Sequence, residues 1–221
     1  MISVDPFEKM VAEVQKHFPK LTAIKKNGKT TKLVGDIDIC GNDGEYFGTF
    51  KILIELPNAF PLAVPKVYEI SHKIKRIEDR HMYQNGECCL DMEHELQFMA
   101  GKEIKLSDFI LTKVYPFLAN QIYFESIGKF AGEEYEHGFD GIRQFYKEKL
   151  HLGDPSIILK ILDSIMHKRI QGRNDPCCCG SNKKLKNCHL HQIEYLSSIL
   201  MDQIQKDYIE FDNFSKKGLT S

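Results

Sequence analysis

Hydrophobic side chains in the first 70 residues change from helical spacing to short runs of the strand type. Close to the N-terminus they recur every three or four positions, after an Asp5-Pro6 pair that is typical of a helix start. Strand-like runs follow at residues 21–26, 32–40, 46–56 and 66–70. Turn-forming residues divide these runs, so the pattern predicts an amphipathic helix and then a four-stranded antiparallel meander with one face on a core.

The spacing of apolar residues becomes helical again beyond residue 105. Ser107 is in position to cap a helix that carries a wide apolar stripe from Phe109 to Ile122, and Pro116 predicts a kink within it. Further helices are expected at residues 142–150, after the Asp154-Pro155 pair, and from Ile193 to Ile204. The chain is therefore predicted to belong to the α+β class, with helices covering the sheet.

Composition and charge narrow the partners and the compartment. The 221 residues include 30 Lys and Arg against 31 Asp and Glu, and the formal net charge of -1 creates no overall field that would attract nucleic acid or an anionic membrane. No apolar stretch approaches the roughly 20 residues of a membrane span, and the N-terminus lacks the features of a signal peptide. We therefore expect a cytoplasmic protein without membrane or nucleic-acid partners.

The cysteines of such a protein are better explained as metal ligands or catalytic thiols than as disulfides. The chain has 7 of them, and most cluster at residues 88–89 and 177–188. Cys40 is isolated at the end of a strand-like run and is expected to be buried.

Cys89 lies in the run from His81 to Asp91, shortly after a turn signal at residues 85–86. Because reactive groups are commonly displayed on loops beside rigid elements, Cys89 is a candidate nucleophile. One alternative is a structural thiol, since free cysteines often behave as small buried hydrophobes. The other is a degenerate site that binds a partner without catalysis. Cys88 is expected to point into the core, because adjacent side chains on an extended segment face opposite ways.

Two segments in the same order along the chain resemble motifs of the ubiquitin-conjugating enzymes. The first, at residues 57–67, reads Pro-Asn-Ala-Phe-Pro-Leu-Ala-Val-Pro-Lys-Val and is similar to that family's Pro-x-x-Tyr-Pro-Phe-x-Pro-Pro-Lys-Val. The second, at residues 85–91, reads Asn-Gly-Glu-Cys-Cys-Leu-Asp and is similar to Asn-Gly-x-Ile-Cys-Leu-Asp. The resemblance covers about residues 5–125, implies that family's fold there, registers Cys89 on the nucleophile and makes Asn85 a further site candidate.

The chain departs from the family pattern close to the nucleophile. Asp79-Arg80-His81 stands where the family has His-Pro-Asn, so His81 occupies the place of the oxyanion-stabilising Asn. An imidazole N–H can donate a hydrogen bond to a developing oxyanion, and the alternative is a loop histidine that only shapes the turn. The usual tryptophan after the nucleophile is missing, and Leu96 with residues 98–99 is expected to fill its space. These departures suggest a bacterial relative.

The resemblance implies an acyl carrier. Cys89 would accept the C-terminus of a ubiquitin-like protein or another protein as a thioester, after activation by a separate enzyme, and pass it to an amine. Bacterial relatives belong to conjugation and antiphage systems, so a defence-system target protein is a further expected partner. The alternative is a non-catalytic adaptor that holds a ubiquitin-like protein. A third hypothesis, a cysteine hydrolase with His137 as the base, ranks last because Gly138 beside it indicates a loop entering a helix.

A second motif, at residues 172–189, brings metal-ligand residue types together. Cys177 and Cys179 are followed at a short distance by Cys188 and His189. Three thiolates and one imidazole suit a closed tetrahedral zinc site, which is structural because it leaves no coordination position open for catalysis.

This motif resembles the SEC-C zinc motif, which occurs at the C-terminus of the secretion motor ATPase SecA and is appended to many bacterial proteins. Cys178 replaces the usual Pro and is a spare thiol, Asn182 replaces the usual Gly, and His191 is an alternative to His189 as the imidazole ligand. So small a module can bury little apolar surface, so we expect zinc to supply most of its folding energy and docking to be its function. The lysines of the motif either meet an acidic patch or phosphate, or form a solvated face: Lys183, Lys184 and Lys186.

Together the patterns and resemblances divide the chain into segments. These are a domain similar to ubiquitin-conjugating enzymes at residues 1–150, a connecting helix at 151–170, the SEC-C motif at 171–191, and a helix and tail at 192–221, with a frayed end from Ser215. Residues 126–170 match neither motif and are expected either to complete the fold or to form a partner surface.

Overall fold

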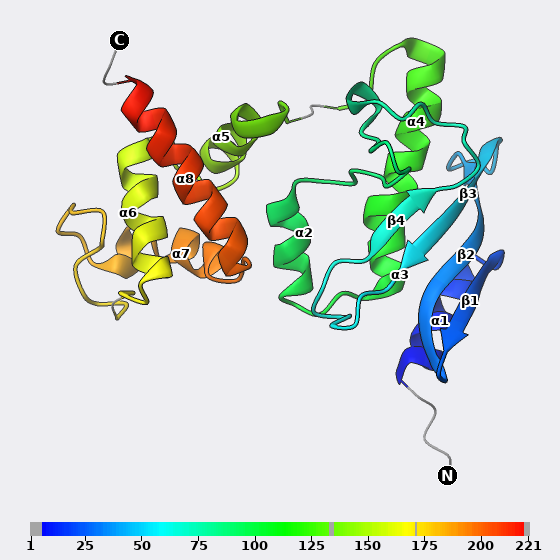
Figure 1. Cartoon of the computed structure of the whole chain (residues 1–221), viewed down its shortest axis with the longest axis horizontal. Helices are drawn as coiled ribbons and strands as arrows, with labels where there is room; N and C mark the ends of the chain where they lie inside the picture. Colours follow the sequence, from blue (N-terminus) through cyan, green and yellow to red (C-terminus); the bar gives the residue numbers. More distant parts are fainter. Residues whose placement is uncertain (1–5, 133–134, 171, 219–221) are drawn as a thin grey trace. The chain divides into compact units, whose positions relative to one another are not determined.

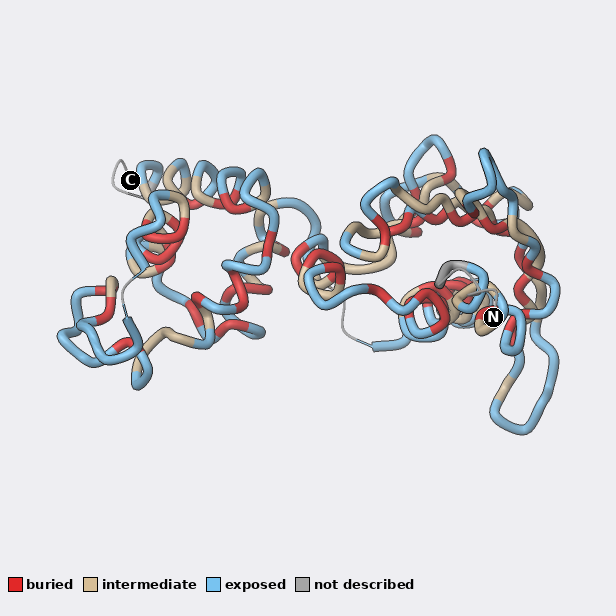
Figure 2. The backbone as a smooth tube through the Cα atoms, turned by 90° about the horizontal axis from the view of Figure 1, so that it is seen from below, coloured by how far each residue is buried: buried red, intermediate tan, exposed pale blue. Residues whose placement is uncertain are grey.

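The computed structural model describes residues 6–132, 135–170 and 172–218. The chain divides into two compact units, residues 1–133 and 134–221 (Figure 1). Figure 2 shows that buried positions recur along one side of the helices and strands within each unit. This recurrence is the expected result of amphipathic elements that turn their apolar sides toward a shared interior.

The first unit is built on a four-stranded antiparallel sheet with the order β1-β2-β3-β4. Its strands are β1 (Leu21–Lys26), β2 (Lys29–Cys40), β3 (Tyr46–Glu55) and β4 (Lys66–Glu69). The register pairs Leu33 with Ile54 and Ile54 with Val67, and all three side chains are buried. Because side chains alternate between the two faces of a strand, this register directs one apolar face of the sheet into the core.

Helices supply the other side of this core. They are α1 (Pro6–His17), the short turn η1 (Glu78–Arg80), α2 (Glu93–Ala100), α3 (Leu106–Phe109), the π-helical turn η2 (Ile110–Val114) and α4 (Tyr115–Ile127). Val14 of α1, Phe109 of α3 and Leu118 of α4 belong to the same buried cluster as Ile52 and Ile54 of β3. The sheet and these helices therefore share one hydrophobic interior.

The predicted α+β class and the four-stranded antiparallel meander are confirmed. The prediction that Ser107 caps a helix is wrong, because the helix begins at Leu106 and Lys105 takes the capping position without a side-chain hydrogen bond. The interruption expected at Pro116 takes the form of the π-helical turn before α4. Proline lacks an N–H and its ring crowds the carbonyl four residues earlier, at Thr112, so a widened turn relieves the conflict.

Helix α2 and the exposure of Cys40 are not expected from the sequence. Helix α2 buries His94 and Leu96, and Gln97 beside them, so polar residues interrupt the apolar period that would have identified it.

Cys40 is exposed at the end of β2, where the prediction was a buried residue. The register shifts between Ile39 and Cys40, which takes Cys40 out of the alternation that buries Ile39.

The second unit is helical. Its elements are α5 (Gly138–Glu148), α6 (Pro155–Met166), the short turn η3 (Leu185–Asn187), α7 (Leu190–Leu196) and α8 (Met201–Gly218). Asp154 caps α6 as predicted, accepting a hydrogen bond from the Ser156 N–H at 2.8 Å. At the centre of the unit, the Tyr146 ring of α5 packs edge-on against Phe211 of α8, with centroids 4.9 Å apart, and its hydroxyl donates to Asp207 at 2.6 Å.

The division after residue 133 differs from the domain boundary expected at residue 150. Helix α5 lies between these positions and buries Phe145 and Tyr146 against Tyr195 and Phe211. It therefore belongs to the second unit. The sequence pattern identifies an amphipathic helix but does not say which core receives its apolar face.

The C-terminal region also differs from the expected single helix. Helix α7 ends at Leu196 and α8 begins at Met201, while Leu200 between them is 63% exposed although the sequence predicts it on the apolar face. Helix α8 continues to Gly218, beyond the expected frayed start at Ser215; residues 219–221, like Asp5 at the other end, lie outside the described part. Of the helices in the described ranges, none combines the length and apolar character required to cross a membrane.

The buried Tyr146 predicts a loss of stability in alkaline solution. Burial, with the charge of Asp207, raises the pKa of Tyr146 well above its ordinary value. Above about pH 10 the unfolded chain loses this proton while the folded chain keeps it, so stability falls by up to about 1.4 kcal/mol per pH unit. Urea unfolding followed by circular dichroism at pH 8 and pH 10.5 will show a steeper loss for the native protein than for Tyr146→Phe. Equal losses in the two proteins would contradict the prediction.

Candidate functional site

The segment that carries Cys89 folds back on itself as a short hairpin. Met82 and Cys88 form an antiparallel bridge, and the Tyr83 N–H donates to the Glu87 carbonyl at 2.9 Å. The Cys89 N–H then donates to the carbonyl of residue 81 at 2.8 Å. The register of the hairpin therefore sets the backbone of His81 opposite that of Cys89.

This hairpin is attached to strand β4 of the sheet. The Cys88 N–H donates to the Val67 carbonyl at 2.8 Å, and the Glu69 N–H donates to the Gly86 carbonyl at 2.9 Å. At Gly86 the backbone φ is +87°, and a Cβ would lie 3.1 Å from the Arg76 guanidinium and 3.2 Å from the Glu69 carbonyl oxygen. Glycine is the residue that fits this turn without strain, so the turn signal in the sequence has a direct structural cause.

The two adjacent cysteines differ in exposure and acidity. Cys88 is buried, and burial, together with the charge of Glu69, raises the pKa of its thiol to about 12. Cys89 is half-buried, and burial is the largest cause that raises its pKa; the Tyr83 hydroxyl opposes the rise by hydrogen-bonding the thiolate. Nearby carboxylates raise the pKa further: Asp91, Glu93 and Glu87. The Cys89 sulfur therefore keeps its proton at neutral pH.

The other predicted site residues have different surroundings. His81 has a left-handed φ of +49°, and its ring lies 5.4 Å from that of Phe130. Asn85 serves the turn itself, because its Oδ1 accepts the N–H two residues later at 3.0 Å. His137 precedes helix α5 in the second unit, whereas Cys89 belongs to the first, and their pairing stays a prediction.

Sequence reasoning overlooks residues that the fold brings to this loop. Tyr83 is 56% exposed and interacts with the Cys89 sulfur. Arg80 is 4% exposed, and its Nε donates to Gln121 Oε1 at 2.8 Å. Once the turn at residues 85–86 is located, the spacing of the hairpin around it could identify Tyr83 as a neighbour of Cys89. No local signal connects Arg80 with Gln121, because 41 positions separate them.

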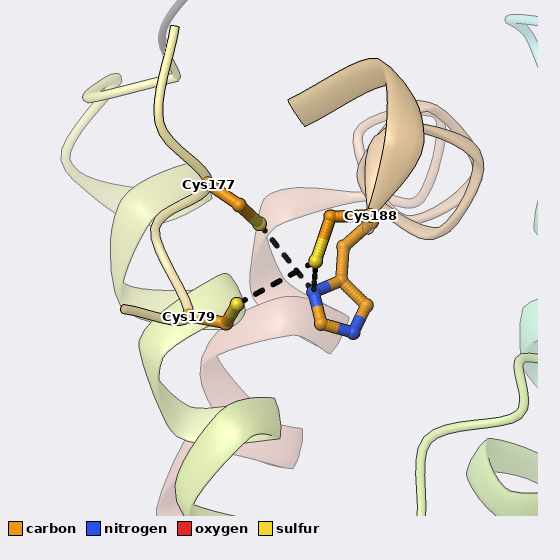
Figure 3. A group of neighbouring side chains, drawn as sticks. Cys177, Cys179 and Cys188 are labelled. Atoms are coloured by element: carbon orange, nitrogen blue, oxygen red, sulfur yellow. Dashed lines mark hydrogen bonds between the residues drawn. The ribbon is translucent and has the colours of Figure 1, made fainter. Parts of the chain in front are cut away.

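The four predicted metal ligands converge in the second unit. One donor atom from each of Cys177, Cys179, Cys188 and His189 lies within 4.8 Å of the others, and Figure 3 shows the three cysteine side chains pointing toward one another. Cys179 Sγ is 3.7 Å from Cys188 Sγ, and His189 Nδ1 is 3.4 Å from Cys177 Sγ and 3.3 Å from Cys188 Sγ. A tetrahedral zinc ion requires about 3.8 Å between sulfurs and about 3.5 Å between sulfur and nitrogen. The donor set therefore fits a zinc-sized ion.

Backbone hydrogen bonds and an apolar anchor hold the loop that carries these ligands. The Cys177 N–H donates to the Lys183 carbonyl at 2.8 Å, and the Leu185 N–H donates to the Asp175 carbonyl at 2.8 Å. Leu185 is buried, and its carbonyl accepts the Cys188 N–H at 3.0 Å. These bonds bring the second pair of ligands back to the first pair. Because so small a loop buries little apolar surface, metal coordination is its main available source of stability.

Polar groups next to the ligands link the loop to its surroundings. Ser181 Oγ lies 3.4 Å from Cys188 Sγ, within hydrogen-bond distance of that sulfur. Lys160 of helix α6 donates to the Cys179 carbonyl at 3.2 Å. Contacts of this kind orient metal ligands in proteins and tie the ligand loop to the helix behind it.

The remaining candidates of this segment lie outside the ligand cluster. Cys178 is half-buried and His191 is exposed, and neither belongs to the clustered donors. The clustered imidazole is His189, as the sequence analysis favours. The lysines of the motif are exposed: Lys183, Lys184 and Lys186.

Comparison with protein families agrees with this part of the sequence analysis. The model of the SEC-C motif matches residues 173–190, a segment that contains all four clustered donors. SEC-C motifs usually bind zinc, so the match and the geometry point to the same chemistry. No curated protein matches the chain.

The surroundings of Cys89 predict slow alkylation at neutral pH. Because its pKa is raised, its reaction with iodoacetamide should be slower at pH 7.5 than that of a cysteine in an uncharged, unstructured peptide, and its rate should keep rising at higher pH, where the peptide thiol has levelled off. Glu93→Gln removes one negative charge beside the sulfur and should accelerate the reaction about threefold. Fragment mass spectrometry separates Cys89 from Cys88, which should react far more slowly.

A matched control for this measurement is Glu13→Gln, which removes a carboxylate on helix α1 that pairs with Lys16. It should leave the Cys89 rate unchanged. Fast alkylation of native Cys89 at pH 7.5, or equal rates in Glu93→Gln and the native protein, would show that the carboxylates do not control the thiol.

Proposed function

We propose that the first unit is a ubiquitin-conjugating-like acyl carrier and that Cys89 is its nucleophile. The observation that carries this proposal is the hairpin register, which sets Cys89, a half-buried thiol, opposite His81 on a loop attached to β4. The four-stranded antiparallel meander, the flanking helices and the two sequence motifs at residues 57–67 and 85–91 support the same resemblance.

The proposed chemistry is the transfer of an acyl group through Cys89. The thiol loses its proton and its sulfur attacks the carbonyl carbon of a thioester on an activating enzyme, which releases that enzyme's thiol with the proton. The new thioester joins Cys89 to the C-terminus of a ubiquitin-like protein or another protein. An amine then attacks the same carbon, the C–S bond breaks, and an amide and the free thiol form as the amine's proton passes to sulfur or solvent.

The raised pKa of Cys89 is compatible with storage of an acyl group. A thiol that holds its proton tightly is a poor leaving group, so its thioester loses the acyl group to water slowly. A Cys–His hydrolase uses a permanently activated thiolate, which a raised pKa at Cys89 does not favour. This supports a carrier over the hydrolase hypothesis that pairs Cys89 with His137.

His81 is the proposed donor to the oxyanion that forms in each transfer. The Cys89 N–H is already bonded to the His81 carbonyl at 2.8 Å, so it is not available as the donor while that bond is kept, and a side chain on the same hairpin is a candidate for this role. Asn85 is engaged in its turn. His81, adjacent to the nucleophile across the hairpin, is therefore assigned this role.

For the second unit we propose a structural zinc site with docking as its function. Cys177, Cys179, Cys188 and His189 would hold the ion, the histidine through Nδ1. Bound zinc would cross-link the loop, and four protein ligands leave it no open position for catalysis. The exposed lysines of the motif suit an acidic partner, which in a bacterial conjugation or antiphage system would be the target protein or the activating enzyme.

A non-catalytic adaptor is the second candidate function. The observation that favours it is the partial burial of Cys89, which raises the pKa of its thiol and also suits a thiol that never reacts. In this case the first unit would hold a ubiquitin-like protein without forming a bond to it.

Intact mass spectrometry after co-expression with the neighbouring genes separates the two functions. The carrier predicts a covalent adduct that thiols release, that is absent in Cys89→Ala and that becomes thiol-resistant in Cys89→Ser, because an oxygen ester replaces the thioester. Cys88→Ser is the matched control and should keep the adduct. If an activating enzyme is active in the same cells and native protein carries no adduct, the adaptor takes the lead.

Metal analysis of the purified chain tests the zinc site. We expect about one zinc ion per chain, and after exchange with cobalt the strong thiolate-to-metal absorption of a tetrahedral site. Cys188→Ser removes a ligand and should reduce the zinc content to less than about a tenth, whereas Cys178→Ser, at the spare thiol, should leave it intact. Equal losses in the two variants, or an octahedral cobalt spectrum, would exclude the proposed ligand set.

A further inference from the structure

We propose that Arg80 is a positioning residue that holds His81 against Cys89 by fastening its segment to helix α4, a role that rests on the acyl-carrier function proposed above. The resemblance to ubiquitin-conjugating enzymes makes the identity of this residue informative. That family has a proline at this place, and a proline restricts its own backbone through its ring. Arg80 has no such ring, but its side chain makes contacts that can restrain the segment instead.

Those contacts are extensive for a single side chain. Arg80 Nε donates to Gln121 Oε1 at 2.8 Å, its Nη2 donates to the Gln121 carbonyl at 3.3 Å, and its Nη1 donates to Glu125 Oε1 at 2.5 Å. In return Gln121 Nε2 donates to the Arg80 carbonyl at 3.0 Å. Arg80 is 4% exposed and Gln121 1%. Buried polar groups are costly to leave without partners, so Arg80 and Gln121 are held in this arrangement. The bond from Gln121 to the Arg80 carbonyl then fastens the Arg80 backbone to α4.

Aromatic rings extend the attachment to the side chain of His81. The Arg80 guanidinium lies 4.3 Å from the centre of the Phe124 ring, a cation–π contact. Phe124 packs on Phe130 with centroids 4.7 Å apart, and Phe130 packs on His81 at 5.4 Å. The end of α4 and the segment after it thus contact both the backbone before His81 and its imidazole.

The backbone of His81 needs such support. Its φ of +49° is unfavourable for a residue with a Cβ and persists only where the surroundings hold it. The His81 N–H donates to Glu78 at 2.7 Å, and its carbonyl accepts the Cys89 N–H at 2.8 Å. A shift of Arg80 would therefore move the carbonyl that holds Cys89 as well as the proposed oxyanion donor.

Amide hydrogen exchange tests the attachment without any substrate. Arg80→Lys keeps the charge but loses the fork of donors, so the Cys89 amide should exchange about tenfold faster, as expected when one hydrogen bond weakens. The Ile52 amide in the core should be unchanged. Gln121→Met, which removes the return bond to the Arg80 carbonyl, should have the same effect and provides a second variant should Arg80→Lys fold poorly.

The matched control is Arg143→Lys in the second unit. Arg143 also pairs with a carboxylate, Asp140 at 3.0 Å, and lies 4.3 Å from the ring of Phe214. It should leave exchange at Cys89 unchanged. If exchange at Cys89 is the same in Arg80→Lys, Gln121→Met and native protein, Arg80 does not position the hairpin.

Discharge of the Cys89 thioester to a free amine tests the link to catalysis. His81→Ala should slow discharge about 100-fold, as loss of an oxyanion donor does. If Arg80 acts through His81, Arg80→Lys should slow discharge in the native background and add little in the His81→Ala background. If Arg80→Lys slows discharge by the same factor in the native and the His81→Ala backgrounds, the two residues act independently and the proposal is overturned. If native protein forms no thioester, the carrier function fails, and the exchange measurement alone then decides whether Arg80 positions the hairpin.

Discussion

The attachment of the cysteine hairpin to strand β4 is the constraint on which the first unit's candidate site depends. Hydrogen bonds from Cys88 to Val67 and from Glu69 to Gly86 continue the sheet into the loop. Because side chains alternate along an extended segment, this register directs Cys88 inward and leaves its neighbour Cys89 only half-buried. A slip of one residue would exchange the two thiols, so the sheet decides which sulfur is available for chemistry.

Backbone hydrogen bonds also restrain the loop of the candidate metal site, but they do not attach it to a sheet with a core of its own. Its loop also folds through backbone hydrogen bonds, and Leu185 is its buried anchor. In the first unit the loop rests on a sheet that has a core of its own, whereas here the ligand atoms themselves must close the structure. Metal coordination would therefore contribute to folding in the second unit, while Cys89 needs no metal for its proposed role.

Their surroundings distinguish the thiols of the two units. Burial is the largest cause that raises the pKa of Cys89, nearby carboxylates raise it further, and the Tyr83 hydroxyl opposes the rise. At the cluster, donor atoms of three cysteines and one histidine lie within 4.8 Å of one another, an arrangement that a bound cation requires. The first environment suits a thiol that stores an acyl group, and the second suits thiolates that bind a cation.

Local patterns in the sequence determined the strands of the sheet, the capping of α6 by Asp154 and the four clustered donors Cys177, Cys179, Cys188 and His189, because each depends on neighbouring residues and short spacings. Tertiary structure alone decided that α5 belongs to the second unit, since an amphipathic period does not identify the core that it enters. It also decided that Arg80 meets Gln121, 41 positions away, because a long-range contact leaves no trace in local spacing.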